Sequence, residues 1–111
     1  MSDTGRPRER RVPAYDVREV RTMFAQGRFR ATVRVEQHLL KCGRDRRMVQ
    51  VCAAALRRGS FHKSQELLGH SGVWADVYRP QWAGVRWYIK IVREDGGEYR
   101  VLSFCRDGEN H

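Results

Sequence analysis

Long hydrophobic runs are absent from this sequence. The longest apolar run is VCAAAL at residues 51–56, whereas a transmembrane helix needs about 20 consecutive apolar residues. The N-terminus also lacks the apolar segment of a secretion signal. We therefore predict a cytoplasmic protein without a membrane partner.

Cysteine is scarce, and its spacing excludes the common cysteine frameworks. Cys42, Cys52 and Cys105 are odd in number, and they form neither a CxxC pair nor a Cys/His ligand spacing. Disulfide networks and structural zinc sites depend on such patterns. Paired carboxylates, a Ser/His/Asp order and a glycine-rich phosphate loop are also missing from the sequence. The sequence thus predicts free thiols, no metal site and no cofactor.

Acidic residues are few in this sequence. Aspartate and glutamate number 13 against 22 lysines and arginines, which gives a net charge of +9. Nearly all of the excess is arginine, because Lys41, Lys63 and Lys90 are the only lysines. The planar guanidinium fork suits phosphate and stacks on bases. A polyanion is therefore the predicted partner, with nucleic acid before membrane. An acidic protein partner and a merely soluble basic surface are the alternatives.

Three helices are predicted in the N-terminal half. The first covers residues 15–27, where Asp16 caps the helix and Gly27 ends the apolar period. A second is expected over about residues 32–42 and a third from 45 to 59, each with apolar residues on one side.

Beyond Phe61 the apolar period changes to two, which is typical of strands. Strands are predicted at residues 73–79, 85–92 and 98–106, with a turn between the last two. The predicted fold class is α+β, with N-terminal helices packed on a C-terminal antiparallel sheet. The predicted organisation is a flexible basic arm at residues 1–13, a single domain at 14–106 and a tail at 107–111.

One predicted strand carries polar groups that suit a phosphodiester. Arg86, Tyr88 and Lys90 lie at i, i+2 and i+4, so their side chains project together. An ordinary solvated face of an antiparallel sheet would show the same alternation. A phenol between two cations nevertheless favours binding of a phosphate, and RNA brings its own nucleophile, the 2′-hydroxyl.

Cleavage by that hydroxyl needs proton transfer and neutralisation of the charge that builds on the phosphorane oxygens. Arginine and lysine can neutralise this charge, and tyrosine, lysine or histidine can transfer the protons. His62 is a candidate, although a lone histidine is more often packed or solvated. His70 lies in a GHSG segment, where a turn is the simpler interpretation. This chemistry requires no metal.

The order of several short motifs resembles the MqsR family of toxins. FHKS at 61–64 is followed by VWADVYRP at 73–80, WYIKI at 87–91 and VLSF at 101–104, and the segment VREVRTMFAQGRFRAT is similar to the family's first helix and link. The resemblance covers about residues 10–106. It implies a RelE/YoeB-like fold, an mRNA interferase activity without a cofactor, and a cognate MqsA-like antitoxin. Operator DNA would be bound only through the complex with that antitoxin.

The resemblance also implies roles for individual residues. Lys63, Tyr88 and Lys90 fall on positions that the family uses in RNA cleavage. The family pattern has glutamine where this chain has Ala75, and lysine where it has Cys105. Arg106 is the candidate replacement for that lysine. The predicted site therefore comprises the catalytic residues Lys63, Tyr88, Lys90 and Arg106 and the RNA-binding residues Arg79, Arg86 and His62.

The leading prediction is a metal-independent endoribonuclease toxin that cleaves single-stranded mRNA by attack of the 2′-hydroxyl and is neutralised by an antitoxin. Two alternatives stay open. Ala75 and Cys105 also fit a catalytically weakened nucleic-acid-binding module. The positive charge alone would fit a regulator that binds an acidic antitoxin.

Overall fold

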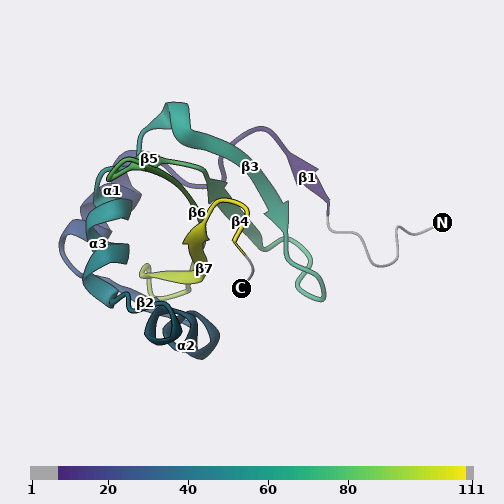
Figure 1. Cartoon of the computed structure of the whole chain (residues 1–111). Helices are drawn as coiled ribbons and strands as arrows, with labels where there is room; N and C mark the ends of the chain where they lie inside the picture. Colours follow the sequence, from purple (N-terminus) through teal and green to yellow (C-terminus); the bar gives the residue numbers. More distant parts are fainter. Residues whose placement is uncertain (1–7, 110–111) are drawn as a thin grey trace.

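A curved sheet with seven strands forms the centre of the molecule (Figure 1). The structure is a computed structural model, and it describes residues 8–109. Six strands follow the order β1-β3-β4-β6-β7-β2, and β5 pairs with β6 outside this path. Neighbouring strands are antiparallel, except that β2 and β7 are parallel. The strands are β1 (Glu9–Arg10), β2 (Phe29–Ala31), β3 (Phe61–Glu66), β4 (Trp74–Tyr78), β5 (Gln81–Trp82), β6 (Val85–Arg93) and β7 (Tyr99–Arg106).

The helices begin where the sequence predicts them. The side-chain oxygens of Asp16, Thr32 and Asp45 each accept a hydrogen bond from a backbone N–H in the first turn of the following helix. Such caps satisfy donors that have no partner inside the helix. The helices are α1 (Val17–Ala25), α2 (Val33–Lys41), α3 (Arg46–Ala54) and one turn of 3-10 helix, η1 (Arg58–Ser60). The prediction of three helices before the main strands is thereby confirmed.

One face of the sheet packs against the helices. Val20 and Phe24 of α1 and Val49 of α3 are fully buried in one cluster with Ile89 and Ile91 of β6. The two isoleucines alternate along β6 with Tyr88 and Lys90, which are only half-buried. The alternation read from the sequence therefore assigns the two faces of β6 correctly, and the polar face is the one turned away from the helices. The fold class is α+β, as predicted.

The residues predicted as a flexible arm contain a short strand, and so does the link between the first two predicted helices, residues 28–31. Residues 9–10 of the arm form β1, which pairs with β3, whereas residues 1–7 lie outside the described part of the chain. Residues 29–31 of the link form β2, which pairs with β7. Strands of two or three residues are too short for an alternating pattern. Tertiary contacts decide whether they form.

Buried Asp76 of β4 fixes the segment between β1 and α1. Its carboxylate accepts hydrogen bonds from the backbone N–H groups of Ala14, at 2.9 and 3.0 Å, and of Tyr15, at 3.0 Å. The Tyr15 hydroxyl donates to the carbonyl of Trp74 at 2.5 Å. These bonds hold the segment against β4, and the chain before it pairs with β3 as β1, the edge strand of the sheet.

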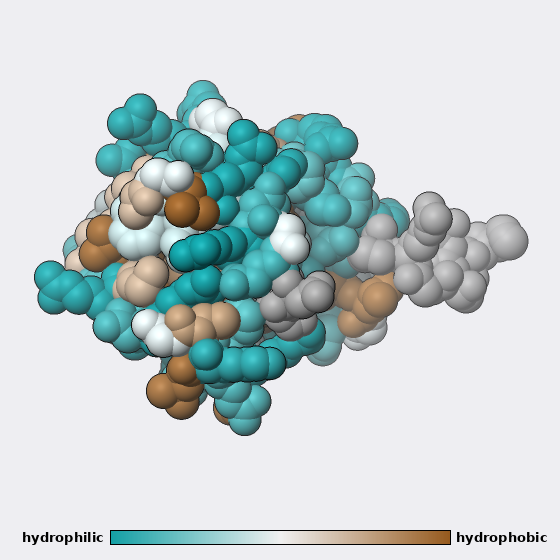
Figure 2. All heavy atoms as spheres, in the orientation of Figure 1, coloured by the Kyte–Doolittle hydropathy of each residue, from teal (hydrophilic) through white to brown (hydrophobic). Residues whose placement is uncertain are grey.

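Hydrophilic residues cover most of the face shown in Figure 2, with isolated hydrophobic residues between them. This pattern agrees with a mean hydropathy of −0.71. Across residues 8–109, every helix is too short or too polar to cross a bilayer.

Candidate active site

Lys63 and Lys90 lie on the same face of the sheet. In the register of the strands, Lys63 of β3 is opposite Val77 of β4, and Val77 is opposite Lys90 of β6. Side chains that are opposite each other in neighbouring strands project from the same face. The two lysines are therefore brought together from positions 27 residues apart, on the face that lies away from the helices.

A chain of hydrogen bonds links the two ammonium groups. Lys90 Nζ donates to Gln65 Oε1 at 2.8 Å. The Glu9 carboxylate oxygen Oε2 accepts from Gln65 Nε2 at 3.2 Å and from Lys63 Nζ at 2.6 Å. We call the group formed by Glu9, Lys63, Gln65, Tyr88 and Lys90 the lysine site. Its carboxylate comes from β1, and its other four members come from β3 and β6.

Lys90 and Glu9, two charged groups of the lysine site, have shifted pKa values. Burial lowers the pKa of the Lys90 ammonium, and the positive charge of Lys63 lowers it further, while Glu9 acts in the opposite direction. The hydrogen bond from Lys63 lowers the pKa of Glu9. At neutral pH Glu9 is thus ionised, and Lys90 loses its proton more readily than an ordinary lysine.

Tyr88 projects on the same face as Lys90, two residues away along β6, and lies opposite Cys105 of β7. Burial raises the pKa of the Tyr88 phenol, and the negative charges of Glu9 and Asp107 contribute to the shift. The phenol therefore stays protonated at neutral pH, as a proton or hydrogen-bond donor. Burial also raises the pKa of the Cys105 thiol to about 11, so this thiol is neutral as well.

Ala75 is opposite Gln65 in the pairing of β3 with β4, and it is fully buried. The alanine methyl group offers no hydrogen bond to the Gln65 amide. Gln65 lies two residues after Lys63, on the same face of the same strand. Its position was therefore readable from the sequence once Lys63 had been singled out. Glu9 gave no such signal, because two residues of a polar arm show no periodicity.

The four remaining predicted residues are placed differently. Arg106 is opposite Trp87, whose side chain belongs to the helix-covered core, so strand alternation places Arg106 on the other face from the lysine site. Arg79 pairs with Asp107 through a contact of 2.5 Å between Nη2 and Oδ2. Arg86 and His62 are within electrostatic range of the same carboxylate, whose pKa they help to lower. Burial lowers the pKa of His62, and nearby cations add to this effect.

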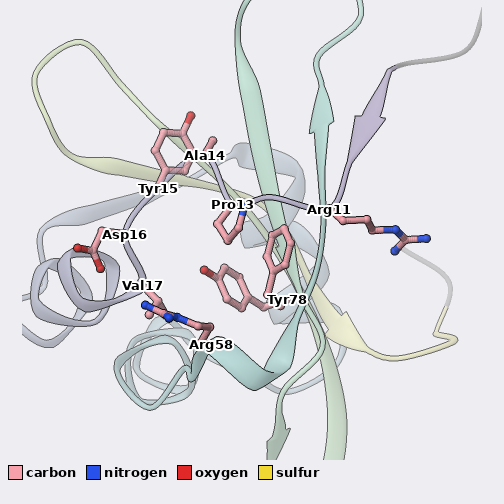
Figure 3. A pocket seen from close by; sticks show the side chains of 9 residues that line it. Arg11, Pro13, Ala14, Tyr15, Asp16, Val17, Arg58 and Tyr78 are labelled. Carbon is pink, nitrogen blue, oxygen red and sulfur yellow. The ribbon is translucent and has the colours of Figure 1, made fainter.

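Two cavities are each lined in part by residues of η1. The first has a volume of about 510 Å³ and is lined by Tyr15, Asp16, Phe61, Tyr78 and Arg58, among others (Figure 3). The second has a volume of about 500 Å³ and is lined by Ala55, Arg57, Gly59, Ser60, Arg79, Pro80, Gln81 and Arg86. We call the second one the arginine cavity. Arg57 was not predicted as a site residue.

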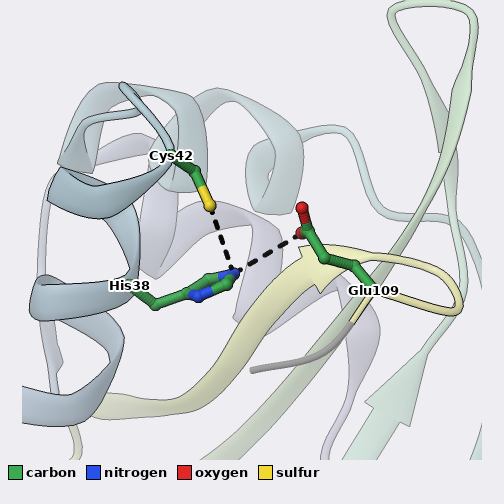
Figure 4. Close-up of side chains that lie close together, drawn as sticks. All are labelled: His38, Cys42 and Glu109. Atoms are coloured by element: carbon green, nitrogen blue, oxygen red, sulfur yellow. Dashed lines mark hydrogen bonds and ion pairs between the residues drawn. The ribbon is translucent and has the colours of Figure 1, made fainter.

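Apart from the lysine site and the two cavities, one cluster of side chains has atoms that could ligate a metal. Within residues 8–109, His38, Cys42 and Glu109 bring one ligand atom each to within 4.8 Å of one another (Figure 4). The Arg44 guanidinium, however, donates to both carboxylate oxygens of Glu109, at 2.7 and 3.0 Å. A cation at this position would have to compete with an existing bidentate ion pair. The geometry therefore favours a structural role, in which the Arg44–Glu109 ion pair holds the segment after β7 against the end of α2.

Comparison with known proteins gives one family. A model of the family described as "Motility quorum-sensing regulator, toxin of MqsA" matches residues 12–106, which include every predicted site residue. No curated protein matches the chain. The matched region begins after Glu9, so this member of the lysine site lies outside it.

Proposed function

The chain belongs to the MqsR toxin family, and from this premise we propose that it is an endoribonuclease that cleaves single-stranded mRNA by attack of the 2′-hydroxyl. The observation that carries the proposal is the convergence of Lys63, Lys90 and Tyr88 on one open face of the sheet. The proposed chemistry uses side chains alone and has no step at a metal.

The scissile phosphate would take the place now filled by the Glu9 carboxylate. A phosphate oxygen and a carboxylate oxygen are both acceptors for the Lys63 ammonium, which donates to Glu9 at 2.6 Å. The phosphoryl oxygens carry more negative charge in the pentacoordinate transition state than in the bound RNA. The fixed cation therefore stabilises the transition state more than it stabilises the bound RNA.

Two proton transfers complete the reaction. Lys90, with its lowered pKa, would take the proton of the 2′-hydroxyl as that oxygen forms its bond to phosphorus. Tyr88 would give its proton to the 5′-oxygen as the P–O5′ bond breaks. The products are a 2′,3′-cyclic phosphate and a 5′-hydroxyl. A high phenol pKa is compatible with this role, because the departing alkoxide is a much stronger base than a phenolate.

Gln65 would supply the amide that Ala75 cannot. The two residues are opposite each other, so an amide on either strand reaches the same part of the face. Gln65 bonds both Glu9 and Lys90, and it would hold Lys90 against the incoming ribose. Arg79, Arg86 and His62 would bind flanking RNA. A role for Arg106 as a catalytic residue stays a prediction, since its strand register directs it to the opposite face.

The description of the family names a toxin of MqsA, and an antitoxin of that type is the proposed protein partner. Binding of operator DNA would require the antitoxin complex, and an mRNA substrate places the protein in the cytoplasm. A second function has specific support in the buried Ala75 and the neutral thiol of Cys105. A chain with these residues could bind RNA and cleave it only weakly.

One pair of substrates tests the proposal. The purified protein is incubated with an RNA that it cleaves and with the same RNA carrying a single 2′-deoxy substitution at the cut site. We expect cleavage of the first RNA only, with a 2′,3′-cyclic phosphate at its new end. Equal cleavage of both RNAs would contradict attack by the 2′-hydroxyl. A protein that binds single-stranded RNA but cleaves none of the unmodified RNAs offered to it would select the second function.

A further inference from the structure

The arginine cavity has the composition of an anion site. Three guanidinium groups, those of Arg57, Arg79 and Arg86, line a space of about 500 Å³ together with the polar residues Ser60 and Gln81. We propose that this cavity binds a second phosphate of the RNA, next to the scissile one. The inference rests on the proposed nuclease function and adds to it a subsite with Arg57 as a phosphate-binding residue.

The positive charge of the cavity is largely uncompensated. Within the described chain, Arg57 and Arg86 make no side-chain hydrogen bond or ion pair, and Arg79 uses only Nη2, toward Asp107. Arg79 Nε is buried and has no hydrogen-bond partner among residues 8–109. A buried donor without a partner costs free energy. Three cations against one carboxylate leave a net attraction for an anion in the cavity.

The cavity adjoins the lysine site along β6. Arg86 precedes Tyr88 by two residues on the same face, which corresponds to about 7 Å along a strand. This separation has the scale of one nucleotide in an extended single strand. Asp107 provides a second link, because it pairs with Arg79 and its charge also reaches Tyr88. One RNA strand can therefore contact the lysine site and the arginine cavity at adjacent phosphates.

Guanidinium groups favour a phosphate over a base as the occupant of the cavity. Each presents parallel N–H donors that fit two phosphate oxygens. Bases would need stacking partners, and the lining residues of this cavity include no aromatic side chain. The cavity in Figure 3, by contrast, is lined by aromatic residues. The two cavities thus differ in the ligand chemistry that they offer.

Short oligonucleotides that cannot be cleaved test the inference. A 2′-O-methyl dinucleotide with one internal phosphodiester is titrated into the full-length protein, alone or with an added 5′- or 3′-terminal phosphate, and binding is followed by NMR. We expect one of the two terminal phosphates to tighten binding to the wild type by about tenfold. Arg57→Ala should remove this gain, and Arg57→Lys should restore part of it.

Arg58→Ala is the matched control. Arg58 is the next residue in the chain, carries the same charge and lines the other cavity. This variant should keep the gain from the terminal phosphate, and thermal unfolding of both alanine variants should match the wild type. An equal gain in Arg57→Ala and in the wild type would overturn the inference. Equal losses in Arg57→Ala and Arg58→Ala would overturn it too, because they would show an effect of net charge alone.

Two further results would reassign the cavity and overturn the inference. Inorganic phosphate that binds as tightly as the phosphorylated dinucleotide would indicate a site for a free anion. Weaker antitoxin binding with unchanged oligonucleotide binding in Arg57→Ala would indicate a protein contact. The experiment measures binding and not cleavage. Its result therefore does not depend on whether the proposed nuclease function is correct. A gain that depends on Arg57 supports the subsite even if unmodified RNA is never cleaved.

Discussion

In the lysine site both ammonium groups have hydrogen-bond partners, whereas two of the three guanidinium groups of the arginine cavity make no hydrogen bond or ion pair within residues 8–109. The four members of the lysine site on β3 and β6 are half-buried, whereas Arg57, just before η1, and Arg86, near the start of β6, are exposed. Chemistry needs groups held in fixed geometry, which partners and burial provide. Binding of a flexible polyanion needs charge that is available to it. The two groups of cations therefore differ in the property that each task requires.

The largest expected effect concerns the proton on Lys90. The guanidinium introduced by Lys90→Arg would keep a positive charge next to Gln65 but cannot give up its proton. We expect the cleavage rate to fall by about 100-fold or more, with RNA binding nearly unchanged. In the wild type, the rate should rise with pH and level off below the pKa of an ordinary lysine, because burial lowers the pKa of Lys90. Single-turnover rates against pH measure both effects.

A rate profile in Lys90→Arg that keeps the same rise with pH would assign the general base to another group. In that case His62, whose pKa is also lowered by burial and nearby cations, is the next candidate. The variant His62→Gln would then lose the rise, and Lys90 would have only an electrostatic role.

The next effect separates position from charge among the lysines. Lys63→Ala removes the cation that donates to Glu9 at 2.6 Å, and we expect about a 100-fold loss in the rate of cleavage. Lys41→Ala is the control, since Lys41 ends α2 and lies outside the sheet. It changes the net charge by the same amount and should change the rate by less than about twofold. Similar losses in both variants would mean that general attraction, and not the lysine site, drives the reaction.

The shared face of Tyr88 and Lys90 was predictable from a local regularity, whereas Lys63 was singled out only through the family resemblance. The period of two along β6 fixes the face of Tyr88 and Lys90, and buried Ile89 and Ile91 confirm that assignment. The resemblance of FHKS to the family motif then singled out Lys63, and the structure places this lysine on β3, a strand that was not among those predicted. The prediction for Arg106 had less support, because its face depends on a register opposite Trp87 that no pattern in the last strand specifies.

Glu9 and Arg57 could not be found in this way, because their places depend on tertiary structure. Glu9 reaches Lys63 because β1 pairs with β3, and the bonds from Asp76 to residues 14 and 15 hold the chain that follows β1. Arg57 precedes one turn of 3-10 helix and meets Arg79 and Arg86 through the pairing of other strands. Short segments with polar sequences carry no hydrophobic period. Their contacts are set by the partners that they meet.

A smaller effect, with the opposite sign, is expected for Glu9→Gln. Glu9 competes with the RNA for Lys63, and its charge also raises the pKa of Lys90. Without this charge, Lys63 is more available and the pKa of Lys90 falls further. We expect RNA binding to tighten and cleavage at neutral pH to speed up, each by about threefold to tenfold. The rise of the rate with pH should move to lower pH. A slower reaction in this variant would show that Glu9 takes part in the chemistry.

Arg8→Gln is the control that separates loosening of β1 from loss of the Glu9 charge. Arg8 pairs with Glu66 at 2.7 and 3.0 Å, next to β1, but its side chain does not contact the lysine site. If β1 merely covers the RNA-binding face, loosening it through Arg8 should speed cleavage as much as Glu9→Gln. If the Glu9 carboxylate itself competes with phosphate, Arg8→Gln should have the smaller effect and should leave the pH profile unchanged.

The smallest effect is expected at the arginine cavity, for Asp107→Asn. Asp107 neutralises one of three guanidinium groups there and is exposed enough for water to screen the pair. Removing its charge should tighten RNA binding by about twofold at low salt, and the gain should disappear at high salt. It should not alter cleavage of bound RNA, because Arg79 does not belong to the lysine site.

A change in the single-turnover rate at saturating RNA would instead mean that Asp107 acts on the chemistry through Tyr88, whose pKa its charge helps to raise. The two groups of cations would then work as one site.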